Sequence, residues 1–238
     1  MKNKNDLYER MEKRKFKGIL FLFFTLSFMY GVDDNEFWTS ITFEKNLPLS
    51  LKLELEQELR FKDQLSTFKQ TFSEISVSYK VFKGLRIKIP YRHLIYEDKT
   101  KQRLSLEGSY KFSLKPISFK SRTKFQRTYE DEEDPDDFIR NKISIHYKWN
   151  KKIEPYVSGE IFHLHNTGKD QFDEYRFSFG LAVNLPQKNS INIFYVFKKE
   201  DITKSSPDMI NVFGVGYGFE WWNTSSMNKM ENTNKPIL

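Results

Sequence analysis

The chain contains no cysteine among its 238 residues. This absence excludes a disulfide framework, thiolate metal sites, a cysteine nucleophile and a lipid anchor attached to cysteine. The sequence also lacks an internal stretch rich in proline, glycine or serine that would mark a domain boundary. It therefore fits one large domain better than two domains of average size.

The sequence has no apolar run long enough to cross a membrane as a helix. Its one candidate extends from Gly18 to Tyr30 and is interrupted by Thr25 and Ser27, whereas a spanning helix needs about 20 residues. A basic cluster directly precedes this run, an arrangement typical of a secretory signal. We expect residues 1–31 to be a signal peptide, with Met11 as an alternative start.

The net charge of +7 does not indicate a nucleic-acid partner. Residues 1–31 hold seven basic and three acidic residues, so the remainder carries only +3, scattered along the chain. The sequence also lacks GxGxxG, P-loop, HExxH and EF-hand spacings. We therefore expect no nucleic acid, cofactor or metal.

Most of the chain alternates strictly between apolar and polar residues. Residues 49–61 read LSLKLELEQELRF, with leucine at every second position from 49 to 55 and charges in most of the gaps. A period of two predicts a strand with one apolar face and one charged face. Eleven segments show this pattern: 37–47, 49–61, 70–82, 84–96, 103–115, 117–129, 138–149, 153–165, 172–185, 190–199 and 209–221.

Length and spacing favour a membrane barrel over a soluble sheet. The segments of about 11–13 residues exceed the usual 5–6 and suit a tilted crossing of a bilayer. Tight links follow the odd segments and longer polar links follow the even ones, as in outer-membrane barrels. The sequence predicts an all-β, antiparallel up-and-down transmembrane β-barrel over residues 36–222, followed by a polar tail, 223–238. We expect about 10 to 12 strands, and an even number, 10 or 12, is required if both ends lie in the periplasm.

In such a barrel the charged faces of the strands line the lumen. Opposed signs are expected to pair across the lumen and fill much of it. We expect a structural barrel or a narrow pore in the cell outer membrane, surrounded by outer-membrane lipids and inserted by the barrel assembly machinery. The predicted lumen-facing charges are Lys52, Glu54, Glu56, Glu58, Arg60, Arg86, Lys88, Arg92, Lys120, Arg122, Lys124, Arg140 and Lys142.

Four stretches resemble a known family. They are FWTSITFEKNL at 37–47, LRF at 59–61, SVSYKV at 76–81 and IPYRH at 89–93. On these residues the sequence resembles the domain of unknown function 2490 family, bacterial proteins expected to form outer-membrane β-barrels. The resemblance implies a fold and a location and supplies no activity.

Several alternatives remain open. Ser144 and His146 share a face and allow a barrel-embedded lipid hydrolase, and a soluble periplasmic barrel with an apolar ligand inside would show the same alternation. His163 and His165 allow a metal site, although a pair at the membrane interface is the simpler interpretation. The acidic run 130–137 is a candidate cation chelator or a solvated loop.

Overall fold

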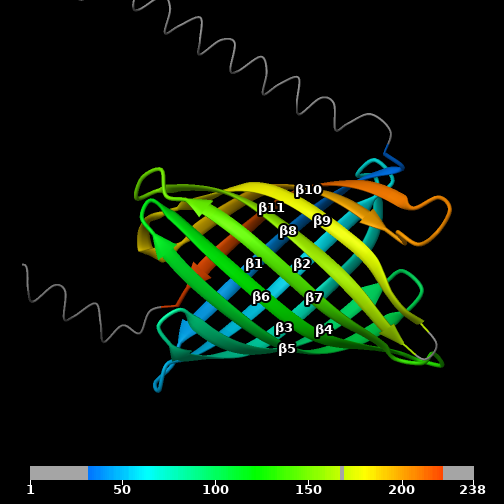
Figure 1. Ribbon diagram of the computed structural model, residues 1–238, viewed down its shortest axis with the longest axis horizontal. Coiled ribbons are helices and arrows are strands. Elements are labelled where there is room, and N and C mark those ends of the chain that lie inside the picture. The colour runs from blue at the N-terminus through cyan, green and yellow to red at the C-terminus, as the bar shows by residue number, and fades with distance from the viewer. Residues whose placement is uncertain (1–31, 167–168, 222–238) are drawn as a thin grey trace, which may run out of the picture.

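The computed structural model describes residues 32–166 and 169–221, and all eleven segments form strands of one closed barrel (Figure 1). The predicted signal peptide and C-terminal tail lie outside the described residues. No helix in the described part of the chain is long and apolar enough to cross a membrane. The strands are β1 Asp34–Asn46, β2 Leu51–Lys62, β3 Thr67–Phe82, β4 Leu85–Tyr96, β5 Thr100–Leu114, β6 Ile117–Glu130, β7 Asp136–Tyr147, β8 Ile153–Asn166, β9 Lys169–Asn184, β10 Ser190–Glu200 and β11 Asp208–Glu220.

The barrel closes with an odd number of strands. Neighbours along the chain pair antiparallel, whereas β1 and β11 run in the same direction and pair parallel, from Asp34 opposite Ile210 to Glu44 opposite Glu220. Eleven strands fall within the predicted range of about 10 to 12, whereas the expectation of an even number was wrong, because a parallel pair joins the two edge strands without an additional one. The first and last described residues consequently lie at opposite ends of the barrel (Figure 1).

The links differ less in length than the sequence suggested. Most of the link predicted between the eighth and ninth segments, residues 166–171, belongs to the strands, since β8 ends at Asn166 and β9 begins at Lys169. The links at the two ends of the barrel differ in their charge. Links 47–50, 83–84, 115–116, 148–152 and 185–189 carry six lysines and no acid, so we call this end the basic rim. Links 63–66, 97–99, 131–135 and 201–207 carry eight acids and two lysines, and form the acidic rim.

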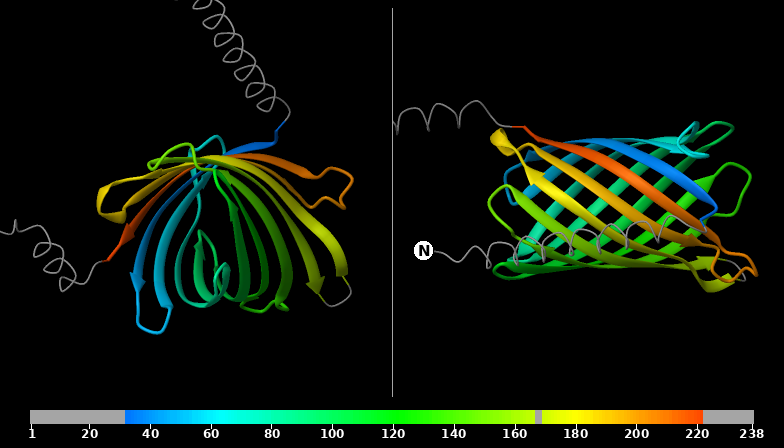
Figure 2. Two further views of the ribbon diagram at one scale, coloured as in Figure 1. Left: turned by 60° about the vertical axis from the view of Figure 1, so that its left-hand side comes forward. Right: turned by 90° about the horizontal axis from the view of Figure 1, so that it is seen from above.

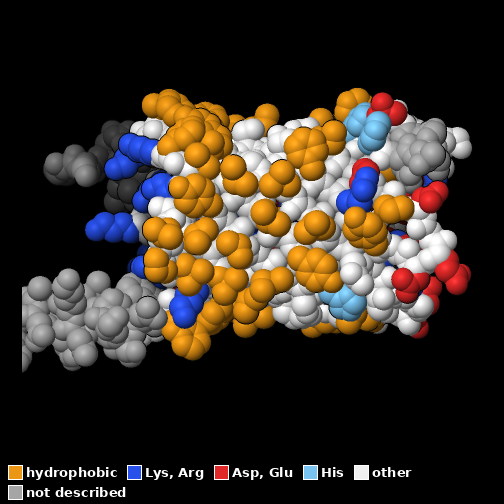
Figure 3. All heavy atoms as spheres, turned by 90° about the horizontal axis from the view of Figure 1, so that it is seen from below, with side chains coloured by type: hydrophobic (Ala, Val, Ile, Leu, Met, Phe, Trp, Pro, Cys, Tyr) orange, Lys and Arg blue, Asp and Glu red, His pale blue; other side chains and the backbone are white. Residues whose placement is uncertain are grey.

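Large apolar side chains cover the outside of the barrel. Leu104 is 49% exposed, Phe125 53% and Ile143 63%. Figure 3 shows such side chains filling the surface between the lysines of one rim and the acids of the other. A surface this apolar suits lipid and is rare on soluble monomers. The transmembrane barrel predicted from the sequence is confirmed, with its strands crossing obliquely (Figure 2).

Glycines on the inner face of the wall make room for aromatic rings in the lumen. A Cβ at Gly214 would lie 2.1 Å from Cζ of Phe194, and one at Gly180 would lie 2.5 Å from the ring of Tyr156. Both distances are far inside van der Waals contact, so no larger residue fits without moving the ring. These rings therefore pack directly on the backbone of β11 and β9.

We predict that Gly214→Ala lowers the resistance of the folded barrel to unfolding by about 1–3 kcal/mol, the usual cost of overpacking. The midpoint of thermal unfolding, followed by gel migration of folded and unfolded forms, measures the effect. Gly159→Ala is the matched control, because its Cβ would meet nothing within 4 Å. The double variant Gly214→Ala/Phe194→Ala should regain part of the loss, and equal midpoints for both single variants would contradict the packing argument.

Candidate functional site in the barrel lumen

Charged side chains lie on the inner face of the wall and are largely buried there. Glu74, Glu107, Lys124 and Glu160 are each less than 9% exposed, although charged residues are rarely buried unless they are paired. The soluble alternative with an apolar ligand inside has no support, because this interior is charged. The predicted lumen charges lie on the inner face, as judged from their ion pairs, from the chamber that they line, or from their position in the strand alternation. They are Lys52, Glu54, Glu56, Glu58, Arg60, Arg86, Lys88, Arg92, Lys120, Arg122, Lys124, Arg140 and Lys142.

The charges pair along the wall, contrary to the expectation that they would pair across the lumen. Glu74 accepts from Arg92 at 2.7 Å on the adjacent strand, and Lys88 reaches Glu54 at 2.6 Å two strands away. Arg122 likewise spans two strands to Glu160 at 2.6 Å. Within the described residues, no ion pair joins opposite walls. Pairing with near neighbours is geometrically sufficient, and it leaves the middle of the lumen less filled than predicted.

Inward aromatic rings support several of the arginines. The guanidinium carbon of Arg92 lies 3.5 Å from the ring centre of Phe72, and that of Arg60 lies 3.7 Å from Trp38. Such cation–π contacts strengthen when water is excluded. These rings are part of the lumen that the alternation of apolar and polar residues does not predict. The available signal was an aromatic residue at a polar position of the alternation, such as Phe72 between Gln70 and Glu74.

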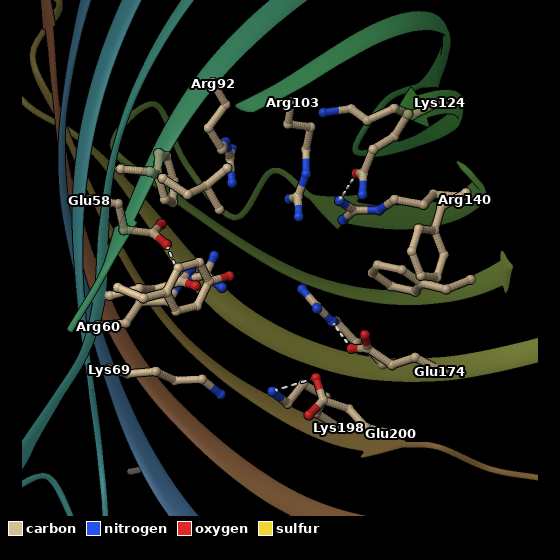
Figure 4. A pocket seen from close by; sticks show the side chains of 18 of the residues that line it. Glu58, Arg60, Lys69, Arg92, Arg103, Lys124, Arg140, Glu174, Lys198 and Glu200 are labelled. Carbon is tan, nitrogen blue, oxygen red and sulfur yellow. Dashed lines mark hydrogen bonds and ion pairs between the residues drawn. The ribbon is translucent and has the colours of Figure 1, made fainter. Parts of the chain in front are cut away.

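The described residues line two separate open chambers in the lumen. The arginine chamber, of about 290 Å³, lies toward the acidic rim, since the last residues of β4 and β10, Tyr96 and Glu200, line it (Figure 4). The seam chamber, of about 280 Å³, lies toward the basic rim and the junction of β1 with β11. Its lining is mostly small and acidic: Ser40, Thr42, Glu44, Glu54, Lys188, Ser190, Asn192, Phe194, Gly216, Tyr217, Gly218, Phe219 and Glu220.

A buried charge cluster spans the closing seam. Glu36 on β1 lies 2.6 Å from Lys69 on β3 and 3.3 Å from Lys198 on β10, and it accepts a hydrogen bond from Trp38 at 2.7 Å. The side chain of Glu36 is 0% exposed and that of Lys198 is 2% exposed. The cluster therefore ties together strands on both sides of the β1–β11 junction.

The remaining predicted sites have simpler explanations. His146 Nδ1 lies 3.0 Å from Glu154, and its ring stacks on Tyr156. In the described chain no hydrogen bond links it to Ser144, which is itself buried. The hydrolase interpretation therefore gains no geometric support.

In both candidate metal sites the side chains already contact other polar groups of the chain. His163 and His165 lie 3.2 and 3.5 Å from the same oxygen of Asp170, a carboxylate that the sequence analysis did not place. The one carboxylate cluster with metal-ligand spacing in the described residues is Glu54, Glu56 and Glu74. Lysine and arginine already neutralise two of its members.

The acidic run is partly paired at the rim. Glu130 contacts both Lys99, at 2.6 Å, and Lys101. The hydrogen bond that Lys99 donates to Glu130 raises the pKa of Lys99 above its ordinary value. Asp137 binds Arg127 through two hydrogen bonds of 2.6 and 2.7 Å on the outer surface. The rest of the run, from Asp131 to Asp134, is exposed to solvent.

The family model for proteins of unknown function DUF2490 matches residues 35–207, which include most of β1 and all of β2 to β10. The chain belongs to this family. The resemblance predicted from the residues is thus confirmed, and the DUF2490 match supplies no activity. A search of the curated proteins found no match.

A solved outer-membrane porin shares the fold, and two further outer-membrane proteins match less closely. A structure described as the NanC porin is 10% identical with a TM-score of 0.50, over 75% of this chain and 93% of that one. A bacterial polysaccharide outer membrane secretin is 10% identical, with a TM-score of 0.47 over 70% and 73% of the two chains. The KdgM porin is 11% identical, with a TM-score of 0.44 over 66% and 81%. At such identities the similarity concerns architecture alone.

We predict that Glu36→Gln destabilises the closed barrel by about 3 kcal/mol. This is the lower end of the cost of breaking a buried ion pair, because Glu200 still contacts Lys198 at 2.8 Å. The urea midpoint of barrel unfolding is the measurement. Glu133→Gln, an exposed residue of the acidic rim, is the control and should leave the midpoint unchanged. A Glu36→Gln midpoint equal to the wild-type value would show that the cluster does not hold the seam.

Proposed function

We propose that this DUF2490 protein is an outer-membrane channel with a narrow, charged lumen that passes small polar solutes. One observation carries the proposal: the lumen holds open chambers toward both rims, bounded by charged and small side chains. A barrel with a purely structural role has no need of open polar space inside. The apolar outer surface and the shared architecture of outer-membrane barrels support the location.

The lumen wall formed by β6 and β7 is predominantly basic. Arg122, Lys124, Arg140 and Lys142 lie on neighbouring strands β6 and β7, and rings of charge in a narrow pore select permeating ions. The proposed channel therefore prefers anions. The acidic rim, which carries the longest link, 201–207, faces the exterior in this proposal.

We predict that the purified protein conducts in planar bilayers with a preference for anions, and that Lys142→Glu shifts the reversal potential toward cation selectivity. Reversing Lys142 breaks no ion pair of the described chain, because Glu160 is held by Arg122 and Arg140. Lys83→Glu, in an exposed turn outside the lumen, is the matched control. A sealed bilayer at every protein concentration would reject the channel.

The odd strand number gives a second prediction. Because the chain has no cysteine, single cysteines can be labelled with an impermeant maleimide in intact cells. Val32→Cys and Asp134→Cys should both react, because residue 32 adjoins β1 at the rim that carries the acidic links. Lys151→Cys, on the basic rim, should react only after the outer membrane is opened. Reaction of Val32→Cys and Lys151→Cys on the same side would contradict parallel closure.

A further inference from the structure

The arginine chamber holds more positive than negative charge. Nine basic residues line it: Arg60, Lys69, Arg92, Arg103, Arg122, Lys124, Arg140, Arg176 and Lys198. Three acidic residues line it, Glu58, Glu174 and Glu200, and four further carboxylates, Glu36, Glu74, Glu107 and Glu160, pair with its cations from behind. Seven negative charges against nine positive ones leave an excess of two positive charges in a confined space.

The guanidinium groups are held in fixed orientations. Glu58 accepts from Arg60 Nε at 2.6 Å, and Glu74 accepts from Arg92 Nε at 2.8 Å, while Trp38 and Phe72 cover one face of each group. In each guanidinium group a glutamate accepts from the Nε edge and an aromatic ring covers one face. The N–H groups on the opposite edge therefore remain available as donors. Planar forks held in this way match the oxygens of carboxylates and phosphates.

Two groups on the chamber wall have unused capacity to donate. Arg103 Nε donates to Thr128 at 3.0 Å, but no carboxylate in the described chain forms an ion pair with Arg103. Arg122 Nε is buried and has no hydrogen-bond partner among the described residues. Figure 4 shows the side chain of Arg103 projecting into the chamber beside that of Arg92. A buried donor left unsatisfied is costly, and an anion in the chamber would relieve that cost.

We propose that the arginine chamber binds a small dianion, carrying either two carboxylates or one phosphate group. Two negative charges match the two excess positive charges, and the volume of about 290 Å³ admits only a compact solute. A cation would meet net repulsion, and an apolar molecule would remove water from the twelve charged groups that line the chamber without replacing its hydrogen bonds. The inference rests on the proposed channel, since it assigns the class of solute that enters the lumen.

The acids of the outer rim do not cancel this preference. Those between Asp131 and Asp134 are exposed in the link, where salt screens charges beyond about 8 Å at physiological ionic strength. The charges of the chamber face one another between walls of low dielectric constant, which concentrate their field. The chamber therefore attracts anions despite an acidic entrance.

Isothermal titration calorimetry of the purified full chain in neutral detergent tests the proposal at one fixed salt concentration. The probes are succinate for a dicarboxylate, inorganic phosphate, acetate as a monoanion and glucose as a neutral solute. We expect succinate or phosphate to bind at least tenfold more tightly than acetate, with no heat from glucose. Comparing the affinities for succinate and phosphate shows whether the chamber prefers a dicarboxylate or a phosphate group.

Two variants distinguish binding in the arginine chamber from a general effect of positive charge in the lumen. Arg103→Gln should weaken dianion binding by about tenfold or more, the loss expected for one charge-assisted hydrogen bond. Arg86→Gln is the matched control: Arg86 also faces the lumen without a carboxylate, donating to Ser78 at 2.8 Å, but does not line the chamber. Its affinity should stay within about twofold of wild type. Heat-modified gel migration verifies that both variants fold.

Three results would overturn the inference: no binding of either dianion to the wild type, equal affinity for acetate and succinate, or equal losses in Arg103→Gln and Arg86→Gln. Arg103→Lys, which keeps the charge and loses the planar fork, should lie between wild type and Arg103→Gln. Conductance without dianion binding rejects the chamber and leaves the channel intact. Binding without conductance supports the chamber and rejects the channel.

Discussion

The need to pair every backbone N–H and C=O group governs the rest of this structure. Lipid offers no hydrogen bonds, so a sheet within it must close on itself. Here closure joins β1 to β11 in parallel, the one pair in the described barrel that departs from antiparallel geometry. Parallel pairing is slightly weaker per residue, and the buried cluster of Glu36 with Lys69 and Lys198 lies across this seam. The weakest join in the wall is thus reinforced from inside the lumen.

Closure also decides what the interior contains. Strand alternation sends the apolar half of each strand to the lipid, so the lumen receives the charged half. Charges confined in this way must be neutralised locally, and they pair with neighbours along the wall at short distances. Aromatic rings such as Phe72 and Phe162 then separate and brace the guanidinium groups. The result is a wall that is charged but rigid, with open space between its paired groups.

The sequence was informative where one residue type at every second position determines the outcome. The leucines and glutamates of residues 49–61 establish both the strand and its orientation, and the lumen charges named from such patterns lie on the inner wall. The partner of the first strand could not be obtained this way, because alternation specifies a face and does not specify a neighbour. Nor could the pairing of Arg122 with Glu160, which depends on the registers of β6 with β7 and of β7 with β8. The inward rings were missed because an aromatic residue on the polar face looks like an interruption of the pattern.

Three consecutive inward positions of strand β11 are glycines, Gly214, Gly216 and Gly218, so no side chain projects from β11 there. The ring of Phe194 covers Gly214, whereas only the small side chains of Ser40 and Ser190 lie over Gly216 and Gly218 beside the junction with β1. The seam chamber, lined by Gly216 and Gly218, occupies this space. If the proposed channel conducts, a solute leaving the arginine chamber for the basic rim would pass along the backbone of the closing strand. The residues that seal the barrel and those that shape its passage are then largely the same, so selection on one property constrains the other.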